Sequence, residues 1–515
     1  MDWPKISFLS HQDKMQKRQI LINSILSVLQ IVVISIVLFF LYKFLLGAIG
    51  AEKFGIWSIV LAATAVTQIA DLGLSGGVVK FVAKYIARKE NQNVSKIIQT
   101  AVLTIGVTVG FVLLMGFPII KWALRFFIPA ESLFLAIEIL PAAFIALWFC
   151  IITSVFLSGL DGYQRFDIRS LILMSGAVFH LLLCLLLVPK HGLLGLAYAK
   201  IAQNISVAIF SWLALKKILP QLPALPYRWN KALFKEIIGY SLNFQVINVA
   251  TMLYDPITKA LLSRFGGLAM VGYYQMAGKM IQKLNALIKA ANQVLVPTFA
   301  DLKEKSSTRI QEIYSTSYQL LFYLAFPIYF MVILCLPMIS EIWIGKYEKA
   351  FVIPAALLAI GWLLNTLSGP AYFANLGIGK LRWNVVGHIM IAVLNVGLGI
   401  ILGTMYQGTG VIVAWMISLA LGSSIIYFSY HITYKIPLSK LIPRSSRWST
   451  AACFTGLALA LIFFQNCKNE LNLYLLSSLT ILIFSAIIFV PVWKNPMRKR
   501  LYGWISEILL KRRNK

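Results

Sequence analysis

The sequence predicts an all-α integral membrane protein with about fourteen transmembrane helices. Of its 515 residues, 59% are hydrophobic and only 13% are charged, and the mean hydropathy is +0.80. These values lie far outside the range of soluble domains. Apolar runs longer than the roughly 18 residues that cross a bilayer as a helix recur almost to the C-terminus. No stretch is left for a sizeable soluble domain.

The breaks between apolar runs divide the chain into the expected spans. The first run begins near Ile20, is too long for a signal-peptide core and has no convincing cleavage site, so we expect it to be retained. The expected spans are residues 20–46, 56–78, 97–119, 132–158, 170–188, 192–215, 237–263, 271–297, 313–338, 352–376, 384–404, 408–430, 449–466 and 471–493.

The distribution of positive charge predicts the orientation, because short loops rich in Lys and Arg stay in the cytoplasm. With the N-terminus inside, about 33 of the 47 Lys and Arg residues fall on the cytoplasmic side and about 9 on the other. We therefore expect a multi-pass protein of the cell membrane with both termini cytoplasmic. The net charge of +29 lies in loops, so it does not indicate nucleic acid.

Short motifs recur at an offset of 217 residues. Gly162 and Arg165 recur as Gly379 and Arg382, and GAEKFGIW (residues 50–57) is echoed by GLAMVGYY (267–274). HGLLG (191–195) and QGTG (407–410) lie within two residues of the same offset. An even number of spans per repeat keeps the orientation, so we expect two six-helix halves related by a pseudo-twofold axis along the membrane normal. A substrate site is then expected between them near the midplane.

Composition shifts predict the domain boundaries. We expect an N-terminal six-helix lobe over residues 1–215 and a cytoplasmic, basic, proline-bearing linker over 216–236. A C-terminal six-helix lobe over 237–430 follows, and then two additional helices over 431–493. The tail, 494–515, reads as a basic amphipathic segment that would lie on anionic lipid.

Three motifs in the first half carry a resemblance to a known family. AEKFGIW after the first span, DLGLSGG (71–77) after the second and GYQRF (162–166) after the fourth resemble the bacterial and archaeal polysaccharide transporters, the flippases of O-antigen and other lipid-linked oligosaccharides. This family belongs to a superfamily with the multidrug and toxin extruders and the peptidoglycan-precursor flippases.

The resemblance implies two lobes in a V around a central cavity, alternating access, and outward movement of a polyprenyl-pyrophosphate-linked glycan. It also implies coupling to H⁺ or Na⁺, with no other cofactor. In the family the GYQRF motif lies in a cytoplasmic loop, which matches the orientation predicted here. We expect Gly162, Gln164, Arg165, Asp167 and the later Arg382 to connect loops between helices rather than to bind substrate.

Polar residues inside expected spans are candidate site residues, because hydrocarbon disfavours them strongly. At about 100° per residue, several form one stripe on the span 271–297. Amides suit sugar hydroxyls, and lysines suit a pyrophosphate. Polar contacts that only hold helices together are the alternative. The candidate cavity residues are Lys279, Lys283, Lys289, Gln275, Gln282, Asn248, Lys259 and Gln30, the last on a stripe with Asn23 and Ser27.

Two carboxylates are candidates for ion coupling. Asp255 and Lys279 should share a depth in the membrane, so Asp255 could pair with Lys279, or with Lys259 at i,i+4. It could instead exchange H⁺ or Na⁺ during turnover. Asp71 lies near the inner end of its span beside a glycine-rich break, where capping the next segment is an alternative role.

The remaining reactive residues form no site by spacing. The five cysteines are odd in number, have no metal-ligand spacing and read as packing residues. Of the histidines, only His180 and His388 look buried within spans, and neither has a visible partner.

No motif for covalent chemistry is present, so we expect a transporter and not an enzyme. Two alternatives stay open. One is a multidrug exporter of the same superfamily, for which several cavity lysines are ill suited. The other is a membrane glycan polymerase or ligase, which would be expected to carry a long external loop.

Overall fold

The computed structural model describes residues 11–65, 74–241, 245–293, 307–437, 443–467, 471–501 and 503. All regular elements within these ranges are helices. Nine of the described helices are long and apolar enough to cross a membrane, so the chain is a multi-pass membrane protein. Its internal contacts divide it into two compact units, Met1–Met252 and Leu253–Lys515.

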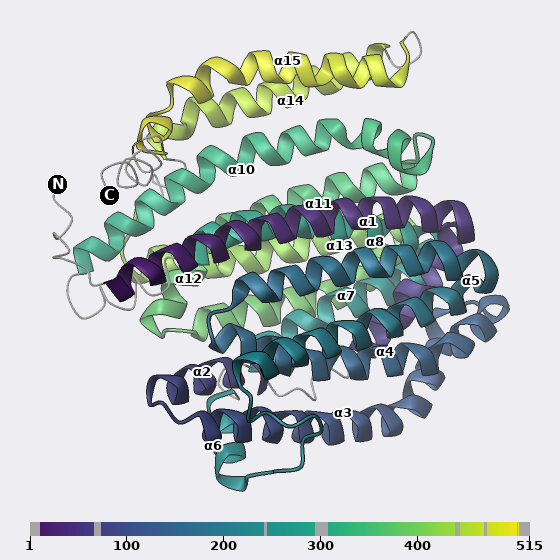
Figure 1. Ribbon diagram of the computed structural model, residues 1–515. Coiled ribbons are helices and arrows are strands. Elements are labelled where there is room, and N and C mark those ends of the chain that lie inside the picture. Colours follow the sequence, from purple (N-terminus) through teal and green to yellow (C-terminus); the bar gives the residue numbers. More distant parts are fainter. Residues whose placement is uncertain are drawn as a thin grey trace. The chain divides into compact units, whose positions relative to one another are not determined.

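The first unit is built around α5, which packs against both α1 and α4 (Figure 1). α3 packs against α4 and α2. α7 crosses the division between the units. The elements are α1 (His11–Ala65), α2 (Leu74–Ala87), α3 (Asn91–Phe127), α4 (Ala130–Gly162), α5 (Phe166–Ile218), α6 (Lys231–Ser241) and α7 (Gln245–Gly266).

In the second unit, α11 packs against α8, α10 and α13. The last two helices form a hairpin whose members contact each other and α10, as Figure 1 shows in yellow and green. The elements are α8 (Leu268–Gln293), α10 (Ser307–Ile344), α11 (Lys349–Leu367), α12 (Gly369–Ile378), α13 (Arg382–Thr433), the short 3₁₀ helix η4 (Arg444–Ser446), α14 (Arg447–Cys467) and α15 (Leu473–Lys494).

Three elements are too long to be single membrane crossings. α1, α5 and α13 have 55, 53 and 52 residues, a rise of about 80 Å each, whereas the hydrocarbon core is about 30 Å thick. Each is broken where the backbone turns to positive φ, at Gly50 (80°), Gly192 (53°) and Gln407 (55°). Each is therefore a pair of helices, and the breaks predicted near these positions are confirmed.

The fourteen predicted ranges all fall mainly on described helix. The recurrence of glycine at an offset of 217 residues also has a conformational basis. Gly50 and Gly267 are 217 residues apart and have φ values of 80° and 81°. Both lie at the junction between the first two expected spans of a half, where a side chain would strain the left-handed backbone.

The segment 219–230, which we call the strap, runs from α5 to α6 along α3. Polar side chains of α3 bind its backbone. The Oε1 atom of Gln99 accepts hydrogen bonds from the backbone N–H groups of Tyr227 (3.3 Å) and Arg228 (3.2 Å). The hydroxyl of Thr100 accepts from the N–H of Asn230 at 3.2 Å. The strap is thus part of the first unit and not a free tether.

The start of α6 is fixed at two points. Asn230 caps the helix, because its Oδ1 accepts from the N–H groups of Ala232 and Leu233 at 2.9 and 3.1 Å. Glu236 forms an ion pair with Lys84 of α2 at 2.5 Å and accepts from the Tyr85 hydroxyl at 3.0 Å. Burial acts to raise the pKa of Glu236, but the bonds from Lys84 and Tyr85 outweigh it and lower that pKa overall.

Candidate functional site

The candidate site in the second unit begins with a charged pair on α7. Lys259, whose side chain is only 3% exposed, donates to Oδ2 of Asp255 at 2.6 Å. Asp255 is 39% exposed, so the pair buries its cation and turns its carboxylate toward the surface of the helix. Of the two partners that the sequence left open for Asp255, the structure brings Lys259 to it. An i,i+4 pair of this kind neutralises a lysine that hydrocarbon would otherwise disfavour.

The face of α7 next to this pair is fixed to the first half of α13. The Tyr254 hydroxyl donates to the carbonyl of His388 and lies 2.9 Å from that residue's Nδ1. One turn further on, Thr258 meets Asn395, whose Nδ2 donates to the threonine hydroxyl at 3.0 Å. Both partners of this second pair are buried.

Close glycine packing continues this contact along α13. The spacing Gly399-x-x-x-Gly403 lets the two helices approach closely. A Cβ at Gly399 would lie 2.6 Å from Leu261, and one at Gly403 would lie 2.6 Å from the ring of Phe265. Glycine at these two positions therefore sets the depth and rotation of α7, and with them the placement of Asp255.

α8 carries the other candidate residues. Gln275 is buried, and Lys279 and Lys283 are partly buried. Nζ of Lys279 lies 3.4 Å from the Oε1 atom of Gln282. At the turn before them, Gly267 joins α7 to α8 with positive φ. The structure therefore places two lysines and two amides along one helix, next in the chain to the Asp255–Lys259 pair.

Several predicted residues cannot be placed in this site by their side chains. Lys289 and Asn248 lie on α8 and α7, but their side chains fall outside the described residues, and so does all of Asp71. Gln30 is partly buried on α1 in the first unit. The assignment of Lys289, Asn248 and Gln30 to a substrate cavity, and of Asp71 to ion coupling, stays a prediction.

A second polar cluster surrounds the turn between α4 and α5, which carries the GYQRF motif. Gln164 has φ 58°, and the N–H of Arg165 donates back to the carbonyl of Leu160 at 2.9 Å, closing the helix end as a Schellman motif. Gly162 is required by packing, because a Cβ there would lie 2.5 Å from Val82.

The two charged residues of the motif bind each other. Nη2 and Nε of Arg165 each lie 3.0 Å from an oxygen of the Asp167 carboxylate. This hydrogen bonding raises the pKa of Arg165. In the later motif the left-handed residue is Gly379 itself, at φ 82°, whereas in the first motif it is Gln164, two positions after Gly162. Arg382 lies over the ring of Trp383 at 5.5 Å. Arg165 and Arg382 thus have different partners.

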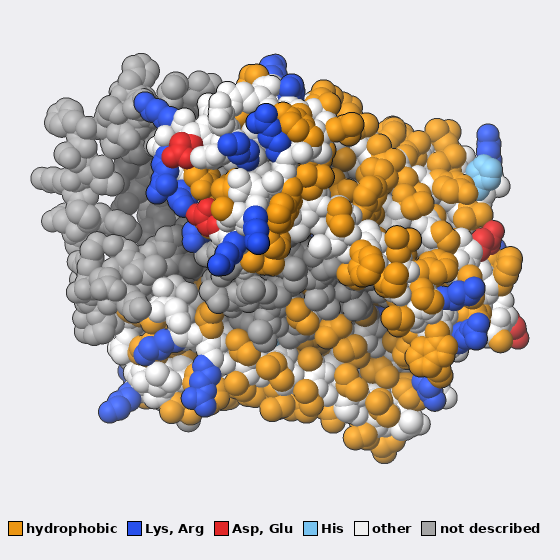
Figure 2. Space-filling model, turned by 90° about the horizontal axis from the view of Figure 1, so that it is seen from below, with side chains coloured by type: hydrophobic (Ala, Val, Ile, Leu, Met, Phe, Trp, Pro, Cys, Tyr) orange, Lys and Arg blue, Asp and Glu red, His pale blue; other side chains and the backbone are white. Residues whose placement is uncertain are grey.

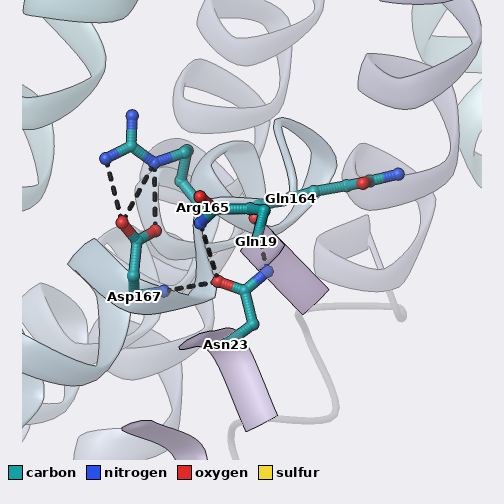
Figure 3. A network of polar contacts seen from close by, with 5 residues as sticks. All are labelled: Gln19, Asn23, Gln164, Arg165 and Asp167. Carbon is teal, nitrogen blue, oxygen red and sulfur yellow. Dashed lines mark hydrogen bonds and ion pairs between the residues drawn. The ribbon is translucent and has the colours of Figure 1, made fainter. Parts of the chain in front are cut away.

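Asn23 of α1 holds this turn in place (Figure 3). Its Nδ2 donates to the carbonyl of Gln164 at 2.9 Å, and its Oδ1 accepts from the N–H of Asp167 at 3.2 Å and from Nε2 of Gln19 at 3.0 Å. The sequence placed Asn23 on a cavity-lining stripe. The structure instead commits both ends of its amide to the α4–α5 turn, so it connects three helices.

Sequence reasoning missed several polar partners. His431 is buried, and its Nε2 lies 2.8 Å from the Tyr314 hydroxyl of α10. His180 meets Cys184 at 3.5 Å, so the expectation that His180 and His388 have no partners is wrong. The partners of His431 and His388 lie on different helices from the histidines. Spacing along a single helix does not reveal such contacts.

Comparisons with known proteins agree on the family and the fold. The family model described as "Polysaccharide biosynthesis protein" matches residues 48–351. A putative O-antigen transporter of Shigella flexneri is 23% identical over 401 residues, which cover 75% of this chain and 92% of the relative.

Two solved structures share the fold. An inward-facing multidrug resistance transporter of the MATE family and MOP superfamily has a TM-score of 0.69 at 15% identity, covering 77% of this chain and 94% of that one. The lipid II flippase MurJ in an inward closed conformation also has a TM-score of 0.69, at 14% identity, covering 92% of this chain and 100% of that one. Because the family model spans more than half of the sequence, the chain belongs to the polysaccharide biosynthesis protein family.

Proposed function

We propose that this protein is a flippase for a lipid-pyrophosphate-linked oligosaccharide. It moves the glycan from the cytoplasmic to the outer leaflet by alternating access, for the synthesis of a cell-surface polysaccharide, and performs no covalent chemistry. Its family, the name of its Shigella flexneri relative and the fold shared with a lipid II flippase support this assignment.

The observation that carries the proposal is the pair of partly buried lysines on α8. Lys279 and Lys283 lie one turn apart on α8, and an amide, Gln282, lies beside the first of them. Ammonium groups bind a pyrophosphate through charge-assisted hydrogen bonds. The cationic drugs expected for a multidrug exporter would be repelled by the same lysines. We assign Lys289, the next lysine of the stripe, to this anion-binding surface as well.

The orientation is part of the proposal. Both termini lie in the cytoplasm and the protein resides in the inner membrane, where the glycan lipid is assembled. The carboxylates proposed for coupling to H⁺ or Na⁺ are Asp255 and Asp71. In the described state Asp255 is bound to Lys259, so coupling through it would require that this ion pair open during the cycle.

The test is complementation of a flippase-deficient strain, with surface glycan and protein level both measured. Lys279→Gln/Lys283→Gln/Lys289→Gln should reach the membrane at the normal level and export little glycan. The corresponding triple Arg variant should keep more export, because charge is the requirement. Normal export by the triple Gln variant would show that these lysines do not bind the pyrophosphate.

A further inference from the structure

The strap and α6 present an unusual surface on the first unit. Leu225, Tyr227 and Trp229 are exposed by 79%, 66% and 51%, although each lies in a segment whose backbone is bound to α3. Figure 2 shows Lys and Arg side chains gathered near α2 and α6 on this face, beside the broad hydrophobic surface that continues along it. The exposed cations nearest in the sequence to these aromatic residues are Arg228, Lys231 and Lys235.

The depth of this surface follows from the length of α3. Its 37 residues rise about 55 Å, and a hydrocarbon core of about 30 Å takes up about 20 of them. A core centred on the helix therefore begins near Gln99. Gln99 and Thr100 bind the strap backbone, and the hydroxyl of Thr104 accepts from the indole N–H of Trp229 at 3.1 Å. The strap thus lies at the boundary between hydrocarbon and headgroups, where Tyr and Trp are enriched.

The charge of this surface is complementary to anions. The strap contains no acidic residue and α6 contains only Glu236, which is already bound by Lys84 and Tyr85. The guanidinium of Arg228 lies 5.1 Å from the centre of the Tyr227 ring, so an aromatic ring and a cation are presented together. Basic residues that only set the membrane orientation would not need to be held in one place. Here Gln99 and Thr100 of α3 bind the backbone of the strap and so fix the position of its cation.

We propose that the strap and α6 form a docking surface for the headgroups of anionic phospholipids, with Arg228, Lys231 and Lys235 as the phosphate-binding cations. Tyr227 and Trp229 enter the interface beside them and fix the height of the first unit in the bilayer. This surface is separate from the proposed glycan site on α7 and α8, and it requires only that the protein spans a membrane.

The experiment uses purified full-length protein titrated with phosphatidylglycerol, phosphatidylcholine or inorganic phosphate, with bound lipid counted by native mass spectrometry. The wild type should prefer phosphatidylglycerol, and inorganic phosphate at the same concentration should not displace it. Arg228→Gln/Lys231→Gln/Lys235→Gln should weaken the tightest phosphatidylglycerol binding by at least about fivefold, the effect expected for loss of even one cation near an anionic surface.

Two further variants make the result specific. Lys53→Gln/Lys121→Gln/Arg125→Gln removes the same charge elsewhere on the unit and should bind phosphatidylglycerol like the wild type. Gln99→Leu keeps every cation but removes the acceptor that holds the strap, so it should also weaken binding while the melting temperature shows a folded protein.

Three outcomes would overturn the proposal. One is unchanged phosphatidylglycerol binding by the strap triple variant. Another is an equal loss in the control triple variant. The third is equal displacement of the lipid by inorganic phosphate, which would indicate a free anion as the ligand.

Discussion

Asn23 donates a hydrogen bond of 2.9 Å to the backbone carbonyl of Gln164, 141 residues further along the chain. The bond joins the start of α1 to the turn that carries the GYQRF motif. Because the same amide also accepts from the N–H of Asp167, one side chain satisfies two backbone groups on either side of Arg165. The conformation of the motif is therefore imposed from another helix.

Replacement of this amide should destabilise the first unit. Asn23→Ala leaves the Gln164 carbonyl and the Asp167 N–H without their partner, and each such group costs about 1–3 kcal/mol when it is shielded from water. The melting temperature of the purified protein should fall by several degrees. Ser35→Ala serves as the control, because the Ser35 hydroxyl donates within its own helix, to the carbonyl of Ile31. Equal melting temperatures for the two variants would show that the hydrogen bonds of Asn23 to Gln164 and Asp167 contribute nothing to stability.

The sequence was sufficient for the helices but not for the role of Asn23. Apolar runs of about 20 residues and glycines between them identify spans, and the breaks at Gly50 and Gly192 fell where expected. An amide on a transmembrane stripe, however, fits a cavity lining and a helix contact equally well. The choice depends on Gln164, which only the packing of α1 against α4 and α5 brings near.

The site on α7 likewise combines a contact that the sequence could predict with contacts that it could not. The sequence left two partners open for Asp255: Lys279, which should share its depth, and Lys259 at i,i+4. The structure brings Lys259 to it. By contrast, the contacts of Tyr254 with His388 and of Thr258 with Asn395 join residues more than 130 positions apart. No periodicity within either helix encodes them, so they were not predicted.

The contact between α7 and α13 predicts a difference between two glycines of the same helix. Gly403→Ala places a methyl group against three atoms of the Phe265 ring and should cost about 1–3 kcal/mol of stability through overpacking. Gly397→Ala meets nothing within 4 Å and should be neutral or slightly stabilising, since alanine is the better helix former. Thermal unfolding of both variants tests this, and an equal effect would contradict the packing described here.

The Lys84–Glu236 pair predicts a pH dependence. The pKa of Glu236 in the folded protein lies below its usual 4.5, so the unfolded chain binds more protons in the interval between the two values. The stability that the pair contributes is therefore present above about pH 4.5 and is lost as the pH falls through the folded pKa. Both side chains are about one-third exposed, which limits the effect to about 1 kcal/mol.

Glu236→Gln provides the comparison for this effect. At pH 7 the variant should melt below the wild type, and the gap should narrow as the pH is lowered to about 3. Glu138→Gln is a matched control, because no ion pair of Glu138 is found among the described residues. A gap that stays constant with pH would mean that the Glu236 charge does not stabilise the fold.

The Asp255–Lys259 pair can be divided into its structural and functional parts by two variants. Asp255→Asn leaves a cation whose side chain is 3% exposed without its anion, and this should cost about 2 kcal/mol, less than for a fully buried pair because Asp255 is partly exposed. Asp255→Asn/Lys259→Met removes both charges and should regain most of that stability. If the double variant is no more stable than the single one, the ion pair is not what holds Lys259 in place. Once stability is restored, export of glycan separates the two roles of the pair. Retained export assigns the pair to the structure of α7, and lost export in a stably folded protein assigns the charged pair to the transport cycle.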